Sequence, residues 1–205
     1  MSAILGLSGC GLLCLATLAT ATRLRRLSIH ARIALMLGAA LAAFVPIGDL
    51  SIAAYVRGVT GDLSVTTLVL AGAACVARLT GRTVIGPRDP RALFWLAASA
   101  AAFLYPFALG WTRFDPYALG YGSIEFVTAL LLVTLAAWHF RQSVVVLIVT
   151  AAVLAYFVGA YESRNLWDYL IDPLAALYAL VRLFAGLRRD RRGEFAETKA
   201  DMSGG

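Results

Sequence analysis

The chain has 205 residues, of which 60% are hydrophobic and 15% are charged, and its formal net charge is +6. Soluble domains carry about 25% charged residues, so this composition argues against an ordinary soluble domain and favours a membrane protein. The positive charge does not indicate nucleic-acid binding, because the arginines stand at the ends of apolar runs and not along one polar face. No linker divides the apolar part, which predicts one helical domain over residues 1–187 and a basic, then polar, disordered cytoplasmic tail over residues 188–205.

Seven apolar runs predict an all-α fold, a polytopic transmembrane helical bundle of about seven spans. A transmembrane helix needs about 20 mostly apolar residues. The expected spans are Ala3–Thr22, Ala31–Gly48, Leu63–Arg78, Ala92–Trp111, Ser123–His139, Ser143–Tyr161 and Leu166–Leu187. The last run is the weakest, because it contains charged residues and a proline. A bundle of six spans, without the first run, is the alternative.

Between the second and third runs the sequence reads GDLSIAAYVRGVTGDLS, in which the tetrapeptide Gly-Asp-Leu-Ser occurs twice. Aspartate is a good N-cap, because its carboxylate accepts hydrogen bonds from the free N–H groups of the first helical turn. Asp49 is therefore expected to cap a short helix over residues 50–57, and Asp62 to cap the third span. A helix of this length cannot cross a bilayer, so it is expected to lie in the membrane interface or to dip partly into the membrane as a re-entrant element.

Basic residues in short loops favour the cytoplasmic side of a membrane. With seven spans, an outside N-terminus and a cytoplasmic C-terminus leave only Arg57, Arg113 and Arg164 of the 18 basic residues outside. The sequence therefore predicts a multi-pass protein of the bacterial cell inner membrane, with its plain arginine-rich loops in the cytoplasm.

The outer loops of this topology are dense in carboxylates and aromatic residues. A lone arginine near a membrane is costly unless it is paired, and Asp49, Asp62, Asp115 and Asp168 are the candidate partners of Arg57. Asp115 and Asp172 each precede a proline, an arrangement typical of helix caps. The candidate binding residues are Asp49, Arg57, Asp62, Arg113, Asp115, Glu125, Arg164, Asp168 and Asp172. These loops either hold one another through ion pairs or form a polar pocket for a headgroup, sugar or ion.

Motifs that would identify a reaction are missing from the sequence. No glycine-rich nucleotide loop, nucleophile elbow or zinc-ligand spacing occurs, so we expect no cofactor and no metal. No catalytic residue can be assigned. The three cysteines lie inside apolar runs and are interpreted as small buried hydrophobic residues.

Three functions agree with these patterns. The favoured one is a non-catalytic accessory protein that assists envelope assembly or a neighbouring membrane enzyme. The alternatives are a membrane enzyme that acts on a lipid-linked substrate at the outer face, with two of the outer aspartates in one pocket, and a small transporter. The expected partners are membrane lipids and either another membrane protein or a lipid-linked glycan.

Overall fold

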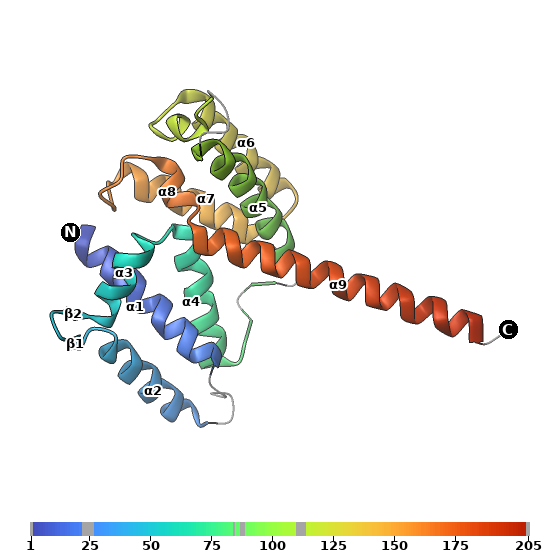
Figure 1. Cartoon of the computed structure of the whole chain (residues 1–205), viewed down its shortest axis with the longest axis horizontal. Coiled ribbons are helices and arrows are strands. Elements are labelled where there is room, and N and C mark those ends of the chain that lie inside the picture. Colours follow the sequence, from blue (N-terminus) through green and yellow to red (C-terminus); the bar gives the residue numbers. More distant parts are fainter. Residues whose placement is uncertain (1, 22–26, 84, 87–88, 110–113, 204–205) are drawn as a thin grey trace.

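The computed structural model describes residues 2–21, 27–83, 85–86, 89–109 and 114–203, and in this part the chain is mostly helical, as the sequence predicts (Figure 1). The helices are α1 (Ser2–Ala21), α2 (Ile29–Ala42), α3 (Ile52–Thr60), α4 (Val65–Thr80), α5 (Asp89–Ala108), α6 (Ile124–His139), α7 (Ser143–Phe157), α8 (Leu166–Leu170) and α9 (Pro173–Ser203), and a 3-10 helix, η2, spans Pro116–Gly120. Two short strands, β1 (Pro46–Ile47) and β2 (Leu50–Ser51), form an antiparallel hairpin.

The helices form two groups that meet at α4. In the first group, α1 packs against α2, α3 and α4; in the second, α5 packs against α7 and α9, and α6 and α8 pack against α7. Helix α4 also contacts α7, α8 and α9, and α9 begins at this junction and runs outward (Figure 1). The largest cluster of buried side chains surrounds Leu166, Trp167 and Tyr169 of α8, so this short helix lies at the centre of the second group.

The predicted membrane topology is wrong. Among the described residues, no helix combines the length and the apolar character that a membrane crossing requires. Several runs that were read as spans form helices of only 14 to 16 residues, namely α2, α4, α6 and α7. At 1.5 Å per residue such helices are shorter than the hydrocarbon core of about 30 Å. This finding overturns the transmembrane, multi-pass and inner-membrane assignments, together with the orientation built on them.

The doubled Gly-Asp-Leu-Ser stretch starts two helices, but the serines and not the aspartates are the N-caps. Ser51 Oγ accepts a hydrogen bond from the Ala54 N–H (3.2 Å), and Ser64 Oγ accepts one from the Thr67 N–H (3.2 Å). The predicted capping roles of Asp49 and Asp62 are therefore wrong. Serine caps a helix as well as aspartate does, so residue type alone does not decide between two candidates two positions apart.

The two glycines of this stretch have the same backbone conformation in different surroundings. Gly48 begins the loop of the β1–β2 hairpin and Gly61 ends α3, and both have a φ of +70°. Glycine adopts positive φ without steric cost. Because the hairpin occupies residues 46–51, α3 begins two residues later than the expected helix over residues 50–57 and continues to Thr60.

The seventh apolar run is divided by Asp172 and Pro173 into α8 and α9. Asp172 caps α9 as predicted, because its Oδ1 accepts a hydrogen bond from the Ala175 N–H (2.7 Å). Its Oδ2 accepts a second one from the Ser64 N–H (2.7 Å), so one buried carboxylate joins the starts of α4 and α9. The backbone of α9 stays helical through Ser203, across the region that the sequence assigns to a disordered tail.

We expect Asp172→Ala to lower the free energy of unfolding by about 3 kcal/mol, because two buried N–H groups lose a charged acceptor and α9 loses its N-cap. The measurement is urea unfolding followed by circular dichroism. Asp49→Ala is the matched control: Asp49 is exposed in the hairpin loop, so its removal should change stability by less than about 0.5 kcal/mol. Equal effects of the two substitutions would contradict the role given to Asp172.

Candidate functional site

A polar cavity of about 390 Å³ lies where the end of α3, the C-terminal part of α5, η2 and the α7–α9 segment meet. Its size lies within the range of small-molecule sites, about 300 to 1,000 Å³. The residues that line it are Thr60, Gly61, Asp62, Leu104, Tyr105, Tyr117, Tyr161, Ser163, Asp168, Ile171, Asp172 and Pro173. Three aspartates and three tyrosines thus surround one space, which we call the polar cavity.

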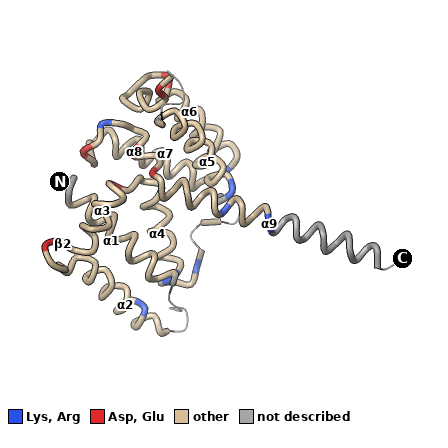
Figure 2. The backbone as a smooth tube through the Cα atoms, in the orientation of Figure 1, with Lys and Arg blue, Asp and Glu red and all other residues tan. Residues whose placement is uncertain are grey.

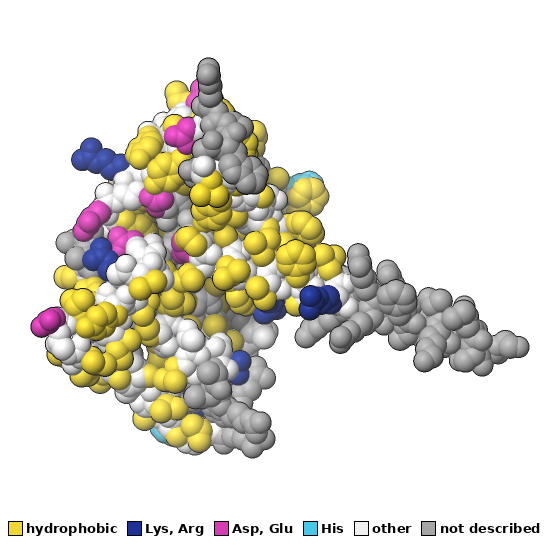
Figure 3. Space-filling model, viewed as in Figure 1, with side chains coloured by type: hydrophobic (Ala, Val, Ile, Leu, Met, Phe, Trp, Pro, Cys, Tyr) yellow, Lys and Arg dark blue, Asp and Glu magenta, His cyan; other side chains and the backbone are white. Residues whose placement is uncertain are grey.

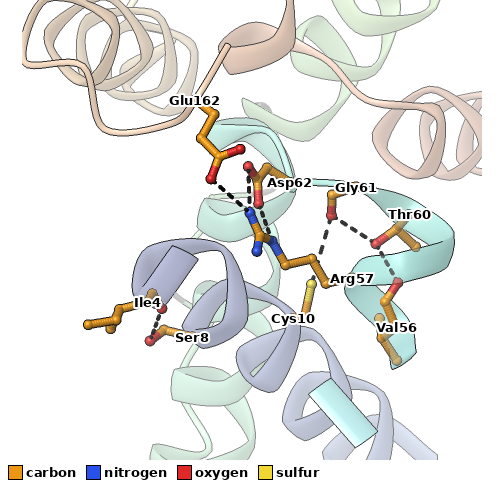
Figure 4. A network of polar contacts seen from close by, with 9 residues as sticks. All are labelled: Ile4, Ser8, Cys10, Val56, Arg57, Thr60, Gly61, Asp62 and Glu162. Carbon is orange, nitrogen blue, oxygen red and sulfur yellow. Dashed lines mark hydrogen bonds and ion pairs between the residues drawn. The ribbon is translucent and has the colours of Figure 1, made fainter. Parts of the chain in front are cut away.

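Arg57 and Asp62 form an ion pair at the edge of the polar cavity (Figure 4). Arg57 Nε and Nη2 donate to the two carboxylate oxygens of Asp62 at 2.7 and 3.3 Å, a two-pronged geometry that holds both side chains. Arg57 Nη2 also lies 3.9 Å from Glu162 Oε1, in the loop after α7. Asp62 is therefore held in place, and Arg57 connects the first helix group to the second through Glu162.

Helix α1 accommodates this ion pair through Gly6. A Cβ atom at Gly6 would lie 2.1 Å from Asp62 Oδ1 and 2.6 Å from Arg57 Nε. Both distances are far below van der Waals contact, so only glycine fits at this position without displacement of the pair. The close approach explains why a glycine stands in the interior of a helix, where it otherwise costs about 1 kcal/mol relative to alanine.

Asp168 also lines the polar cavity and is held by two hydroxyl groups. The Tyr117 hydroxyl donates to its carboxylate at 2.9 Å from Oδ2, and Ser163 Oγ also donates to Oδ2. The Ser163 hydroxyl oxygen in turn accepts a hydrogen bond from the Asn165 N–H (3.0 Å). Because these donors are neutral hydroxyl groups, they fix the position of the carboxylate without supplying a positive charge to balance it.

The wall formed by η2 is fastened to α8 by two buried side chains. Asn165 caps α8 through Oδ1 and donates from Nδ2 to the Tyr117 carbonyl at 2.8 Å. Trp167 Nε1 donates to the Pro116 carbonyl at 2.9 Å. Gly120 permits this contact, because a Cβ there would lie 1.8 Å from Asn165 Oδ1. The carbonyl groups of Pro116 and Tyr117 are thus both bound, which fixes Tyr117 where its hydroxyl reaches Asp168.

Two tyrosines of the polar cavity, Tyr105 and Tyr161, have raised pKa values. Burial, and next the negative charges of Asp172 and Asp168, raise the pKa of Tyr105 to about 12. Burial, and next the charge of Asp62, raise the pKa of Tyr161 to about 12. Both hydroxyls are therefore neutral donors near pH 7. Among the described residues, the buried Tyr105 hydroxyl has no hydrogen-bond partner.

Negative charge predominates around the polar cavity. Asp62 is balanced by Arg57, whereas no described basic side chain forms an ion pair with Asp168 or Asp172. Figure 2 shows the described acidic residues along the side of the molecule that runs from the hairpin past α8 to the start of α6, and Figure 3 shows acidic side chains gathered on the same side. The described residues contain no cluster of three or more side chains suited to a metal ion.

The structure brings together four of the nine sequence-predicted candidates: Arg57, Asp62, Asp168 and Asp172 lie at or in the polar cavity. Of the four candidate partners of Arg57, Asp62 is the one that binds it. The others are elsewhere or not described: Asp49, Glu125 and Arg164 are exposed, Asp115 is exposed and caps η2, and Arg113 lies outside the described residues.

Sequence reasoning missed the three tyrosines, Ser163 and Asn165. The density of aromatic residues in the loops around residues 105–123 and 161–173 is a signal for the tyrosines, since a loop rich in tyrosine and aspartate can build a polar pocket. No local pattern distinguishes Asn165, whose importance depends on its contact with a segment 48 residues earlier in the chain.

Comparisons with known proteins add no identification: no protein-family model, no curated protein and no solved structure matches this chain.

We expect Gly6→Ala to lower the free energy of unfolding by about 1–3 kcal/mol, because the new methyl group must displace the Arg57–Asp62 pair. Gly72→Ala in α4 is the control, since nothing lies within 4 Å of its added Cβ, and it should gain up to about 1 kcal/mol from helix propensity. Urea unfolding measures both. A Gly6→Ala protein as stable as Gly72→Ala would show that α1 does not pack against the ion pair.

Stability should also fall at alkaline pH. An unfolded tyrosine has a pKa of about 10, whereas Tyr105 and Tyr161 in the folded chain have pKa values of about 12. Since the unfolded state loses these protons first, their contribution to stability is complete below about pH 10 and is lost as the pH rises to about 12. Urea unfolding across this interval should show a smaller decline for Tyr105→Phe/Tyr161→Phe than for the parent chain; an identical decline would contradict the assignment.

Proposed function

We propose that this protein is a non-catalytic binding protein, an accessory to other components, that holds a small organic cation in the polar cavity. The observation that carries the proposal is the Tyr105 hydroxyl, a buried donor that no described residue satisfies. A buried donor without a partner costs about 1–3 kcal/mol. Such a group in a cavity wall is explained if a ligand supplies the missing acceptor.

The charge of the polar cavity indicates the class of ligand. Asp168 and Asp172 carry negative charge that no described basic side chain balances, and the shape of a cavity concentrates such a field. Tyrosine rings also attract cations through the negative face of the ring. An organic cation that carries a hydroxyl or carbonyl oxygen would satisfy both the carboxylates and the Tyr105 donor.

The remaining side chains of the polar cavity serve as a preorganised frame in this proposal. Asp62 is held by Arg57, Asp168 by Tyr117 and Ser163, and Asp172 by two backbone N–H groups. Each carboxylate therefore keeps its position before a ligand arrives, which lowers the entropic cost of binding.

Acid–base catalysis at the same cavity is a second candidate, favoured by one observation: Asp62 and Asp168 line a single space, as the enzyme hypothesis requires. A general base needs a free lone pair within hydrogen-bond reach of the proton that it removes. Both carboxylates already accept hydrogen bonds within the protein, which supports binding over catalysis. The transporter alternative presupposes membrane spans, which no described helix provides.

The test uses choline and its uncharged isostere 3,3-dimethylbutan-1-ol as probes, with binding measured by isothermal titration and thermal unfolding at constant ionic strength. We expect choline to bind and to raise the Tm, and the isostere to bind at least tenfold more weakly, because only choline carries the charge. Equal affinities, or no binding of choline, would contradict the proposal.

Tyr105→Phe separates binding from stability. Loss of the hydroxyl should weaken choline about 2–10-fold, and should raise the free energy of unfolding of the ligand-free chain by about 1 kcal/mol, because an unsatisfied buried donor disappears. Tyr55→Phe is the matched control, because Tyr55 is exposed on α3 outside the polar cavity. A Tyr105→Phe chain that binds choline as the parent does would exclude Tyr105 from the site.

A further inference from the structure

A second, larger hollow lies between α1, α4, α5 and α9, and Leu174 and Ala175, which follow Asp172 and Pro173 in the chain, line it. Its volume is about 760 Å³, and its walls are mostly apolar, with four threonines, Tyr178 and Arg182 as the polar members. Leu13 of α1, Leu70 of α4, Leu93 of α5 and Leu174 of α9 represent the four walls. We call this hollow the apolar groove.

Small side chains create the apolar groove. Ala16 of α1, Ala71 and Ala74 of α4 and Ala175 of α9 line it, so these three helices leave space beside α5 that their side chains do not fill. An apolar space without protein atoms loses the dispersion contacts that a packed core would provide, and apolar walls that face water are unfavourable. A hollow of this size is also within the range of ligand sites.

One charged side chain lies at the wall of the apolar groove. The guanidinium group of Arg182 on α9 lies 5.6 Å from the ring centroid of Phe94 and 5.7 Å from that of Tyr178, and its Nη1 donates to the Tyr178 hydroxyl at 3.1 Å. Two aromatic rings therefore hold this cation beside an apolar space. Among the described residues, no carboxylate forms an ion pair with it.

We propose that the apolar groove binds a single-chain anionic amphiphile of the fatty-acid class, with its chain along the alanine-rich walls and its acid group at Arg182. Charge complementarity selects this occupant, because the one ionic group that lines the groove is positive and arginine matches the planar geometry of a carboxylate. The inference is independent of the function proposed for the polar cavity, since the charged residues of the two sites differ.

The test is displacement of dansylundecanoate fluorescence from the purified 205-residue chain, below the micelle concentration of each competitor. The competitors are dodecanoate, 1-dodecanol and dodecyltrimethylammonium, which share a chain length and carry negative, zero and positive charge. We expect dodecanoate to bind about tenfold more tightly than the alcohol and the cation to bind most weakly. Equal binding of the three, or no binding of dansylundecanoate, would overturn the proposal.

Two variants assign the binding to the groove. Arg182→Gln should weaken dodecanoate about tenfold and leave 1-dodecanol within about twofold, whereas Ala74→Phe should fill the groove and weaken both at least tenfold. Arg141→Gln and Ala129→Phe are matched controls, because both residues are exposed and neither lines a described hollow. Because the Arg182 side chain is exposed, Arg182→Gln should leave the fold intact, and its effect on binding can be measured even if Ala74→Phe does not fold.

The oligomeric state distinguishes the main competing occupant. Light scattering during size-exclusion chromatography should show the same mass with and without dodecanoate. Two results together would overturn the proposal: the chain is a dimer that Ala74→Phe dissociates, and dodecanoate displaces no dansylundecanoate from it. They would assign the apolar groove to a second copy of this chain.

Discussion

The buried carboxylate of Asp172 is the contact on which the rest of the structure depends. It accepts hydrogen bonds from the backbone of Ser64 at the start of α4 and of Ala175 at the start of α9. Two helix N-termini, each with partial positive charge, therefore meet at one negative charge, which offsets the cost of burying it. Because α4 belongs to the first helix group and α9 to the second, this carboxylate also sets the position of one group relative to the other.

The polar cavity and the apolar groove both follow from that junction. Asp172 and Pro173 line the polar cavity, and Leu174 and Ala175, the next two residues, line the apolar groove. A single turn of chain thus separates a space that favours positive charge from one that favours hydrocarbon. The contact of Arg57 with Glu162 provides a second connection between the helix groups, beside the Arg57–Asp62 pair that α1 approaches through Gly6.

Sequence reasoning located the helices well, because apolar runs and capping residues are local signals, and the Asp172–Pro173 cap is the clearest example. It failed in the interpretation of the apolar runs as membrane spans. Ala152 and Tyr169 are fully buried, whereas Leu132, Leu154 and Phe157 are mostly exposed, and periodicity does not separate these two groups in runs that are apolar on every side. The polar cavity was predictable only in part. Arg57 required a carboxylate nearby, which indicated Asp62 among others, but the contact of Asn165 with the Tyr117 backbone joins distant segments that no local pattern connects.

The two copies of Gly-Asp-Leu-Ser differ in what natural variation they can tolerate. Gly48 and Gly61 share a positive φ, and Ser51 and Ser64 share a capping role, so the first and last letters are constrained in both copies. The middle letters are not equivalent. Asp49 and Leu50 are exposed, whereas Asp62 holds Arg57 and Leu63 is only 2% exposed. Over evolutionary time, Asp49 and Leu50 should therefore be replaced more readily than Asp62 and Leu63. The glycine and the serine of both copies should remain, and the repeat should become unrecognisable as a tetrapeptide.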